Sequence, residues 1–209
     1  MPNIELLEKS MPVAPIRIAA LGCRELAEEV DRKLVKFRNE LVERKQLSVI
    51  PQGYSEESFI VECECPRFGT GEGKGYIKES VRGTDLYIMV DVTNYSESYT
   101  VCGHENHMSP DNHFQDLKRI ISAATGKAHR INVIMPFLYE GRQHRRTKRE
   151  SLDCALALKE LSDMGVSNII TFDAHDPRVQ NSIPLNGFDN FSYLSVFKSS
   201  DQECAGSSC

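Results

Sequence analysis

Short apolar runs alternate with longer segments of helical periodicity along most of this chain. Residues 16–21 form an apolar run that stops at Gly22, and residues 24–44 then place apolar side chains at helical spacing. This pattern predicts a strand followed by a helix. Further β-rich runs occupy residues 59–63, 85–90, 131–137 and 168–172. Helical spacing returns in residues 114–124 and 151–164, and Gly165 is placed to end the second of these helices.

Strands that are apolar throughout and alternate with helices are typical of a mostly parallel sheet covered on both faces. The predicted fold is therefore α/β, with one domain over residues 16–191 and no internal repeat. Residues 1–15 are predicted to be a loose extension, and residues 192–209 a disordered or non-native tail. Parallel sheets bind ligands beyond the carboxyl ends of their strands, so the loops after residues 131–137 and 168–172 are candidate sites.

Composition and charge narrow the class of protein. The 209 residues are 40% apolar and 26% charged, which is ordinary for a folded globular chain. No apolar run approaches the roughly 20 residues of a membrane-spanning helix, so a membrane partner is not expected and we predict a cytoplasmic protein. Seven cysteines without Cys-x-x-Cys spacing are predicted to be reduced thiols. A net charge of -5 argues against nucleic acid as a partner, so any anion site must be local.

One such local site is predicted between Gly141 and Arg149. Five fixed cations fall within eight residues, directly after a predicted strand: Arg142, Arg145, Arg146, Lys148 and Arg149. Guanidinium groups bind phosphate oxygens bidentately and stay charged at physiological pH, so this segment suits a polyphosphate. A solvated charged loop or a small nucleic-acid patch would have the same composition.

A second candidate is the pair Asp173 and His175, where the last predicted strand ends. In extended geometry their side chains would point to the same face. A carboxylate and an imidazole there could bind Mg²⁺ directly or through water beside a substrate phosphate, and few protein ligands are expected because magnesium keeps several waters. The same residue types also cap helices that follow strands, which is the simpler interpretation of the pair alone.

Two further segments have glycine-rich or polar patterns for which a purely structural role is the simpler interpretation. Residues 68–75 alternate glycine with other residues, which favours a flexible hairpin, although the ring of Phe68 could stack on a base. His104, His107 and His113 follow Cys102 at irregular intervals, in what is predicted to be a polar loop rather than a zinc site.

Several of these segments together resemble one family. Phe68 to Gly83, ending Glu-Ser-Val-Arg-Gly, is similar to a stretch of the ribose-phosphate pyrophosphokinases and matches it without a gap. Residues 136–146, which run from proline through aromatic residues into Arg-Gln-His-Arg-Arg, resemble the family's arginine-glutamine-aspartate segment. Thr171-Phe-Asp-Ala-His175 and the Ile-Pro-Leu-Asn that follows complete a resemblance covering about residues 16–191.

The resemblance implies a reaction and its partners. Family members transfer diphosphate from Mg-ATP to ribose 5-phosphate to make phosphoribosyl pyrophosphate. Phe68 and Glu72 would hold the adenine, reaching the site of a neighbouring subunit, since family members form homo-oligomers with shared ATP sites. Arg142 and Gln143 would also bind the nucleotide.

The resemblance also implies which residues handle the phosphates and the metal. Arg145, Arg146 and Arg149 would lie near the phosphates and stabilise charge on the transferred group. His175 would contact the Mg²⁺ carried by ATP, with Asp173 close by. These five residues are the expected catalytic and metal-binding set.

Departures from the family pattern indicate a divergent branch. Thr70 and His144 each replace an aspartate, and residues 96–111 form a longer, more polar connection than usual. Nothing after Phe191 resembles the family's second α/β half, which supplies the ribose 5-phosphate loop. We therefore expect the 209 residues to bind nucleotide but to transfer diphosphate weakly or not at all. A truncated, noncatalytic partner or regulatory subunit of the full-length enzyme is the alternative.

Overall fold

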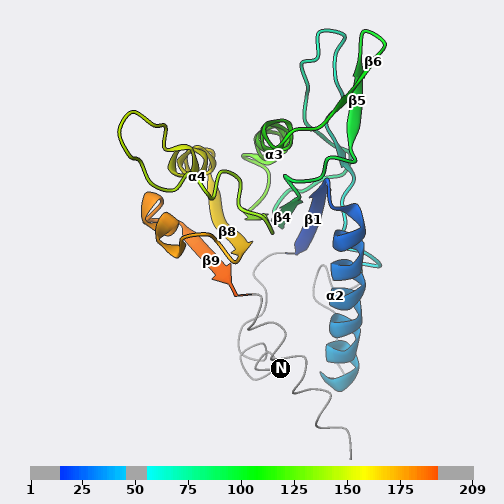
Figure 1. The fold of residues 1–209 in the computed structure, drawn as a ribbon. Coiled ribbons are helices and arrows are strands. Elements are labelled where there is room, and N and C mark those ends of the chain that lie inside the picture. Colours follow the sequence, from blue (N-terminus) through cyan, green and yellow to red (C-terminus); the bar gives the residue numbers. More distant parts are fainter. Residues whose placement is uncertain (1–14, 46–55, 193–209) are drawn as a thin grey trace, which may run out of the picture.

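The computed structural model describes residues 15–45 and 56–192 (Figure 1). The expected N-terminal extension lies outside the described residues except for Pro15, and the expected tail lies outside them except for Ser192. Along the described chain, strands and helices alternate as the apolar pattern predicts.

A five-stranded parallel sheet forms the centre of the domain. Its order is β1-β4-β7-β8-β9, and every neighbouring pair is parallel. The strands are β1 Ile16–Leu21, β4 Asp85–Val90, β7 Arg130–Ile134, β8 Val166–Phe172 and β9 Gly187–Phe191. The prediction of an α/β fold with a mostly parallel sheet is confirmed. The edge strand β9 was not predicted, because it is mainly exposed and its sequence contains no apolar run.

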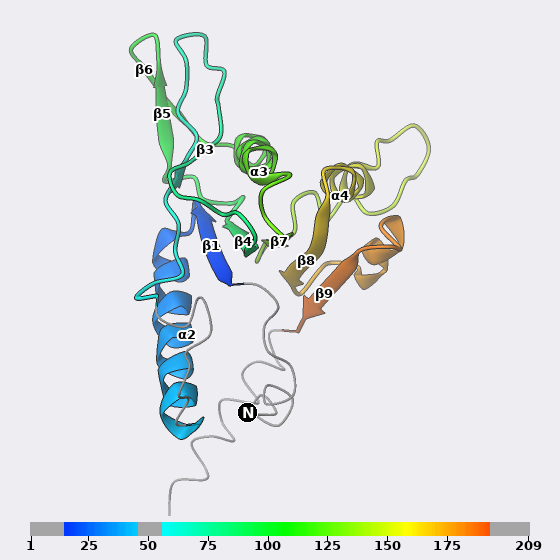
Figure 2. The ribbon, with the colours of Figure 1, turned by 180° about the vertical axis from the view of Figure 1, so that it is seen from behind.

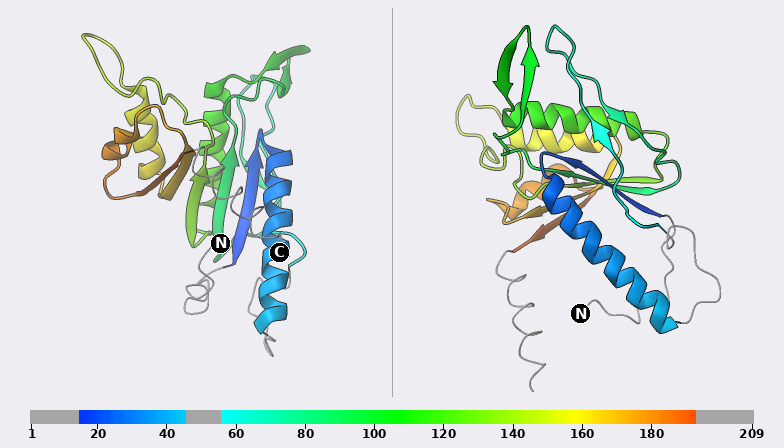
Figure 3. Two further views of the ribbon diagram at one scale, coloured as in Figure 1. Left: turned by 60° about the horizontal axis from the view of Figure 1, so that its bottom comes forward. Right: turned by 90° about the vertical axis from the view of Figure 1, so that its right-hand side faces the viewer.

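Helices cover both faces of this sheet (Figure 3). Helix α2 (Arg24–Lys45) packs on one face, where Ala27 meets Ile18 and Met89. Helices α3 (Pro110–Ala124) and α4 (Asp153–Asp163) cover the other face with the larger apolar core. Burying each large aliphatic side chain there stabilises the fold by about 1.5–3 kcal/mol.

Local signals set the ends of α3 and α4. The Ser109 side chain accepts a hydrogen bond from Asn112 N at the start of α3, and Pro110 takes the first helical position, where its missing N–H costs nothing. Gly165 follows α4 with φ +88°, and its N–H donates to Ser162 O at 2.9 Å. The predicted glycine end of this helix is confirmed.

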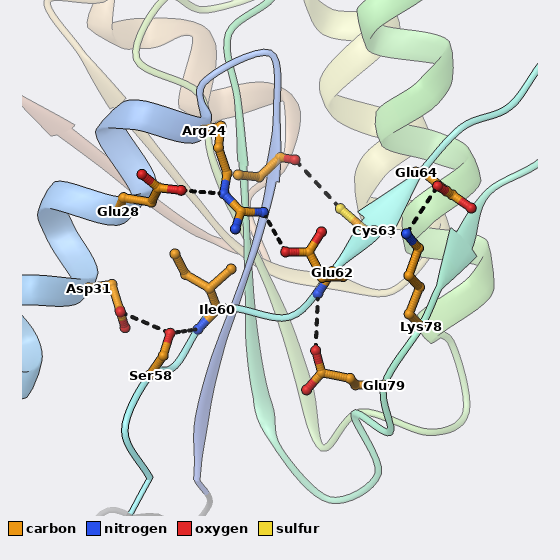
Figure 4. Close-up of polar contacts among 11 residues, drawn as sticks. Arg24, Glu28, Asp31, Ser58, Ile60, Glu62, Cys63, Glu64, Lys78 and Glu79 are labelled. Carbon is orange, nitrogen blue, oxygen red and sulfur yellow. Dashed lines mark hydrogen bonds and ion pairs between the residues drawn. The ribbon is translucent and has the colours of Figure 1, made fainter.

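The segment beside β1 is less regular than its sequence suggests. We expected a strand over residues 59–63, but only Ile60 pairs with β1, through a single parallel bridge to Ile18. Helix α2 holds the segment instead: Asp31 accepts a hydrogen bond from Phe59 N at 2.7 Å. It also accepts one from the Ser58 hydroxyl at 2.9 Å (Figure 4). Strand β1 has the Ile60 segment on one side and β4 on the other. The chain connections therefore lead away from β1 in opposite directions along the sheet.

Two hairpins project together from the sheet (Figure 2). The first is closed by β2 (Cys63–Glu64) and β3 (Tyr76–Ile77), and the second consists of β5 (Ser98–Val101) and β6 (His104–His107). The prediction of a polar loop in the second region was wrong, because Cys102 and Gly103 take positive φ angles of 51° and 80° that form a tight hairpin turn.

Candidate functional site

The arginine-rich loop leaves the sheet at the end of β7 and is anchored first by Tyr139. The Tyr139 ring stacks on Phe114 of α3 with 4.3 Å between ring centroids, and its hydroxyl donates to Asp111 Oδ1 at 2.6 Å. Burial and this hydrogen bond raise the pKa of Tyr139 well above its usual value. The loop therefore starts from a fixed point on the protein surface.

Gln143 closes the loop on itself. Its side-chain amide donates to Ser151 O at 2.8 Å, and its backbone carbonyl accepts from Cys154 N at 3.3 Å, at the start of α4. These bonds join the two ends of the arginine-rich segment. In this structure the side-chain amide of Gln143 is hydrogen-bonded within its own loop. A contact between Gln143 and the nucleotide stays a prediction.

The guanidinium groups of this loop face solvent. Arg142 lies over the ring of Phe137 at 6.0 Å, while Arg145, Arg146 and Arg149 are exposed. Within residues 15–45 and 56–192, no carboxylate lies within ion-pair distance of these four arginines. The loop therefore presents positive charge that is largely uncompensated, which is what an anion site requires.

The Asp173 and His175 pair has a different geometry from the one expected. Asp173 has φ +43°, so the chain leaves the extended conformation there and the extended geometry expected for this pair was wrong. Its N–H donates to Phe191 O at 3.0 Å, and Ala174 N donates to Asn190 Oδ1 at 3.0 Å. The turn therefore rests on β9, and the Asp173 and His175 side chains are both exposed.

A contact that the sequence did not predict joins this turn to the arginine-rich loop. The rings of His144 and His175 lie 5.1 Å apart, and His144 Nε2 is 3.5 Å from Asp176 Oδ2. Hydrogen bonds from Arg178 hold the pKa of Asp176 far below its usual range, so it is a carboxylate. The only sequence signal was that His144 departs from the family pattern.

The hairpin predicted for the glycine-rich segment is confirmed. Phe68 N donates to Glu72 O at 2.7 Å across the turn, and the Phe68 side chain is 54% exposed. Glu72 is also exposed and accepts from the Thr70 hydroxyl at 2.9 Å. Figure 1 shows this hairpin on the opposite side of the domain from the arginine-rich loop. A single chain therefore does not bring Phe68 and Glu72 to Arg142.

The histidines after Cys102 are dispersed among different elements. His104 and His107 lie on β6, whereas His113 is buried in α3 with Nε2 2.8 Å from Asn94 O. Among the residues that the structure describes, no group of three or more His, Cys, Asp or Glu side chains could hold a metal ion. Asp173 and His175 likewise belong to no such group among the described residues, so a metal ion held there would also need ligands from a substrate or water.

A cleft of about 690 Å³ opens at the carboxyl ends of β1, β4 and β7. It is lined in part by Gly22, Asp91, Asn94 and Phe137. Gly22 has φ +69°, and a Cβ added there would lie 2.9 Å from Asp91 O, so the turn into α2 requires glycine. The cleft occupies the point where the connections diverge, where open α/β sheets generally bind ligands.

The fold and these loops define a doubly wound α/β protein with an exposed, arginine-rich loop at the carboxyl edge of its sheet. Residues 18–165 match the family model described as the N-terminal domain of ribose phosphate pyrophosphokinase. This chain belongs to that family, as its motifs indicated.

The chain spans less than half the length of the curated relatives it matches. Ribose-phosphate pyrophosphokinase of Oceanobacillus iheyensis is 28% identical over 140 residues, which are 65% of this chain and 40% of that protein. Putative ribose-phosphate pyrophosphokinase 2 of Streptococcus pneumoniae serotype 4 is 35% identical over 124 residues, 57% of this chain and 34% of the relative.

A solved structure has the same fold. Phosphoribosylpyrophosphate synthetase from Mycobacterium smegmatis superposes with a TM-score of 0.62 at 20% identity, over 90% of this chain and 52% of that one. In residues 15–45 and 56–192, none of the helices has the length and apolar character needed to cross a membrane.

Proposed function

We propose that this chain is the ATP-binding N-terminal half of a ribose-phosphate diphosphokinase, which transfers diphosphate from Mg-ATP to ribose 5-phosphate. The observation that carries the proposal is the exposed loop containing Arg142, Arg145, Arg146 and Arg149, which lies beside His175 and whose arginines form no ion pair with the described carboxylates. It stands in a chain that matches the family model over residues 18–165. We further propose that the protein works in the cytoplasm.

The arginines would act by charge. Phosphoryl chemistry needs little covalent help from a protein, so rate enhancement comes from positioning and from cations placed where negative charge develops. Arg142 would bind the nucleotide with Gln143, and the more distal arginines would neutralise the transferred diphosphoryl group. The arginines of the loop form no ion pairs with the neighbouring carboxylates that the structure describes, so ATP could bind to them without displacing a carboxylate.

The turn at residues 173–175 is suited to a magnesium ion carried by ATP. Mg²⁺ usually keeps several waters and takes one or two protein ligands together with substrate phosphates. His175 and Asp173 are exposed at the end of β8, so they would hold such an ion directly or through water. When bound, the metal would neutralise part of the negative charge of the ATP phosphates.

The residues that bind the adenine of ATP would come to this site from the hairpin of a second subunit. Phe68 is exposed and Glu72 lies across the same turn, but their hairpin projects on the opposite side of the domain from the loop that precedes α4 (Figure 1). We therefore propose a homo-oligomer in which Phe68 and Glu72 of one protomer complete the nucleotide site of its neighbour. The purified chain would then show concentration-dependent assembly and nucleotide binding.

Isothermal titration of the 209-residue chain with Mg-ATP tests the proposal. Arg142→Ala and His175→Ala should each abolish or strongly weaken binding, whereas the matched control Arg32→Ala, which removes an exposed arginine of α2, should not. No binding by an assembled chain would contradict the nucleotide site and favour the noncatalytic partner. We expect weak or no phosphoribosyl pyrophosphate formation from the chain alone, and rapid formation would contradict that part of the proposal.

A further inference from the structure

The β5–β6 hairpin lies against the hairpin that carries Phe68. Figures 1 and 3 show the two projecting side by side from the same end of the sheet. They meet along their length: Cys102 Sγ donates to Gly69 O at 3.5 Å, and a Cβ on Gly71 would lie 3.6 Å from Val101 Cγ2. The β5–β6 hairpin therefore supports one side of the glycine-rich turn.

The bases of the two hairpins are joined by a buried charge network. Arg67 makes two 2.8 Å hydrogen bonds to the carboxylate of Asp116 on α3, and both side chains are less than 10% exposed. Arg119 binds the same carboxylate at 2.5 Å. The other side of the Arg67 guanidinium is covered by the ring of Tyr99 on β5, 4.9 Å away. Arg67 is thus held between helix α3 and the second hairpin.

Apart from Gly73 and Gly75, which lie directly against Arg119 of α3, the glycine-rich hairpin is held mainly by contacts of its own. Its own cross-strand contacts are the two-residue pairing of β2 with β3, one bridge between Arg67 and Gly73, and backbone hydrogen bonds around the turn. A two-stranded hairpin of this length is marginally stable in water. A neighbouring element that fixes Arg67 and Gly69 would therefore change how often Phe68 occupies its bound position.

We infer that the β5–β6 hairpin is a brace that orients the Phe68 hairpin for adenine binding, with Tyr99 as its main positioning residue. The inference rests on the proposed nucleotide site, because it assigns the brace to the residues that would hold the adenine. Ordering the hairpin before binding would reduce the entropy lost on binding. Tyr99 acts through Arg67 and does not itself contact nucleotide.

Amide hydrogen exchange of the nucleotide-free chain tests the brace independently of ATP. Phe68 N, Gly71 N and Lys74 N all donate hydrogen bonds within the hairpin. Tyr99→Ala should speed exchange of these amides about two- to fivefold, the range expected for losing a partly exposed cation–π contact. Tyr99→Phe, which keeps a ring, should restore slow exchange. Tyr95→Ala is the matched control, since Tyr95 is 61% exposed and makes none of these contacts.

A second variant removes the whole brace. Met108 N donates to Glu97 O at 2.9 Å, so residues 98–107 can be replaced by a short Asn-Gly turn between adjacent ends. Exchange of the Phe68 hairpin should then rise at least as much as in Tyr99→Ala, while core amides of β4 stay protected. Unchanged hairpin exchange in both variants overturns the brace.

Titration with Mg-ATP then separates the two proposals. If the unaltered chain binds Mg-ATP, Tyr99→Ala should weaken binding about two- to fivefold and Tyr99→Phe should not. Unchanged affinity in a variant whose hairpin has loosened overturns the link between brace and nucleotide. If the unaltered, assembled chain does not bind Mg-ATP, the nucleotide site fails and with it the adenine role, while exchange alone still decides whether β5–β6 holds the hairpin.

Discussion

His144 Nε2 lies 3.5 Å from Asp176 Oδ2, although the two residues belong to loops that follow different strands of the sheet. Both side chains are largely buried, at 13% and 12% exposure. The contact places the arginine-rich loop beside the turn that carries His175, so the two halves of the proposed phosphate and metal site are joined within one chain. Family resemblance alone gave His144 no role, because that position departs from the family pattern.

Loss of this contact should weaken nucleotide binding more than it weakens the fold. We expect His144→Ala to reduce Mg-ATP affinity about three- to tenfold, since a charge-assisted contact of this kind contributes on the order of 1 kcal/mol. His129→Ala, which removes an exposed histidine of the same chain, is the control for affinity. Equal affinities of His144→Ala and His129→Ala would remove His144 from the site.

The arginine-rich loop should bind in a salt-dependent manner. Arg145→Ala, Arg146→Ala and Arg149→Ala should each lower Mg-ATP affinity and make it less sensitive to added salt, because an exposed cation is screened by counterions. Their melting temperatures should match that of the unaltered chain, since none of the three makes an ion pair within the described residues. Titrations at two salt concentrations measure both effects. A salt response like that of the unaltered chain in all three variants would contradict their role.

Buried thiols should make the fold sensitive to alkaline pH. Burial raises the pKa of Cys154 from 9.0 to about 11 and that of Cys65 to about 12. Because the folded-state pKa is the higher one, the stabilisation is complete below about pH 9 and is lost as the pH rises through 11.

Thermal melting at pH 8 and pH 10.5 measures this effect. The fall in melting temperature between the two pH values should be smaller in Cys154→Ala than in the unaltered chain, because that variant has lost one shifted thiol. Cys102→Ala removes an exposed thiol and serves as control. If Cys154→Ala and Cys102→Ala lose the same amount, burial of Cys154 does not contribute to the pH dependence.

Two glycines with similar backbone angles should differ in their tolerance of a methyl group. Gly22 and Gly126 have φ angles of +69° and +74°, but only at Gly22 would a Cβ meet a backbone atom, Asp91 O at 2.9 Å. Gly126→Ala should cost about 1 kcal/mol of unfolding free energy for its backbone conformation alone. Gly22→Ala should cost more and should also distort the cleft at the ends of β1 and β4. Urea denaturation of both variants compares the two costs, and equal values would mean that the turn at Gly22 relaxes freely.

Strands and helices with strong periodicity could be predicted from the sequence. Residues 85–90 were predicted as a strand and form β4 over that span. A central strand of a sheet covered on both faces is buried on both sides, so it is apolar along its whole length and easy to recognise. Residues 59–63 have a similar composition, yet hydrogen bonds from Ser58 and Phe59 to Asp31 of α2 leave only one bridge to β1. Contacts with another element, which local pattern does not contain, decided that difference.

The sequence by itself determined the α/β class, the order of the main elements and the family, because buried strands, helix ends and motif spacing are local properties of the chain. It also located the arginine-rich loop and the residues at the end of β8. Only the tertiary structure decided that His144 meets Asp176 and that Tyr99 covers Arg67, since each contact joins segments far apart in the chain. The left-handed turn at Asp173 likewise depends on hydrogen bonding to β9, which no local residue pattern specifies.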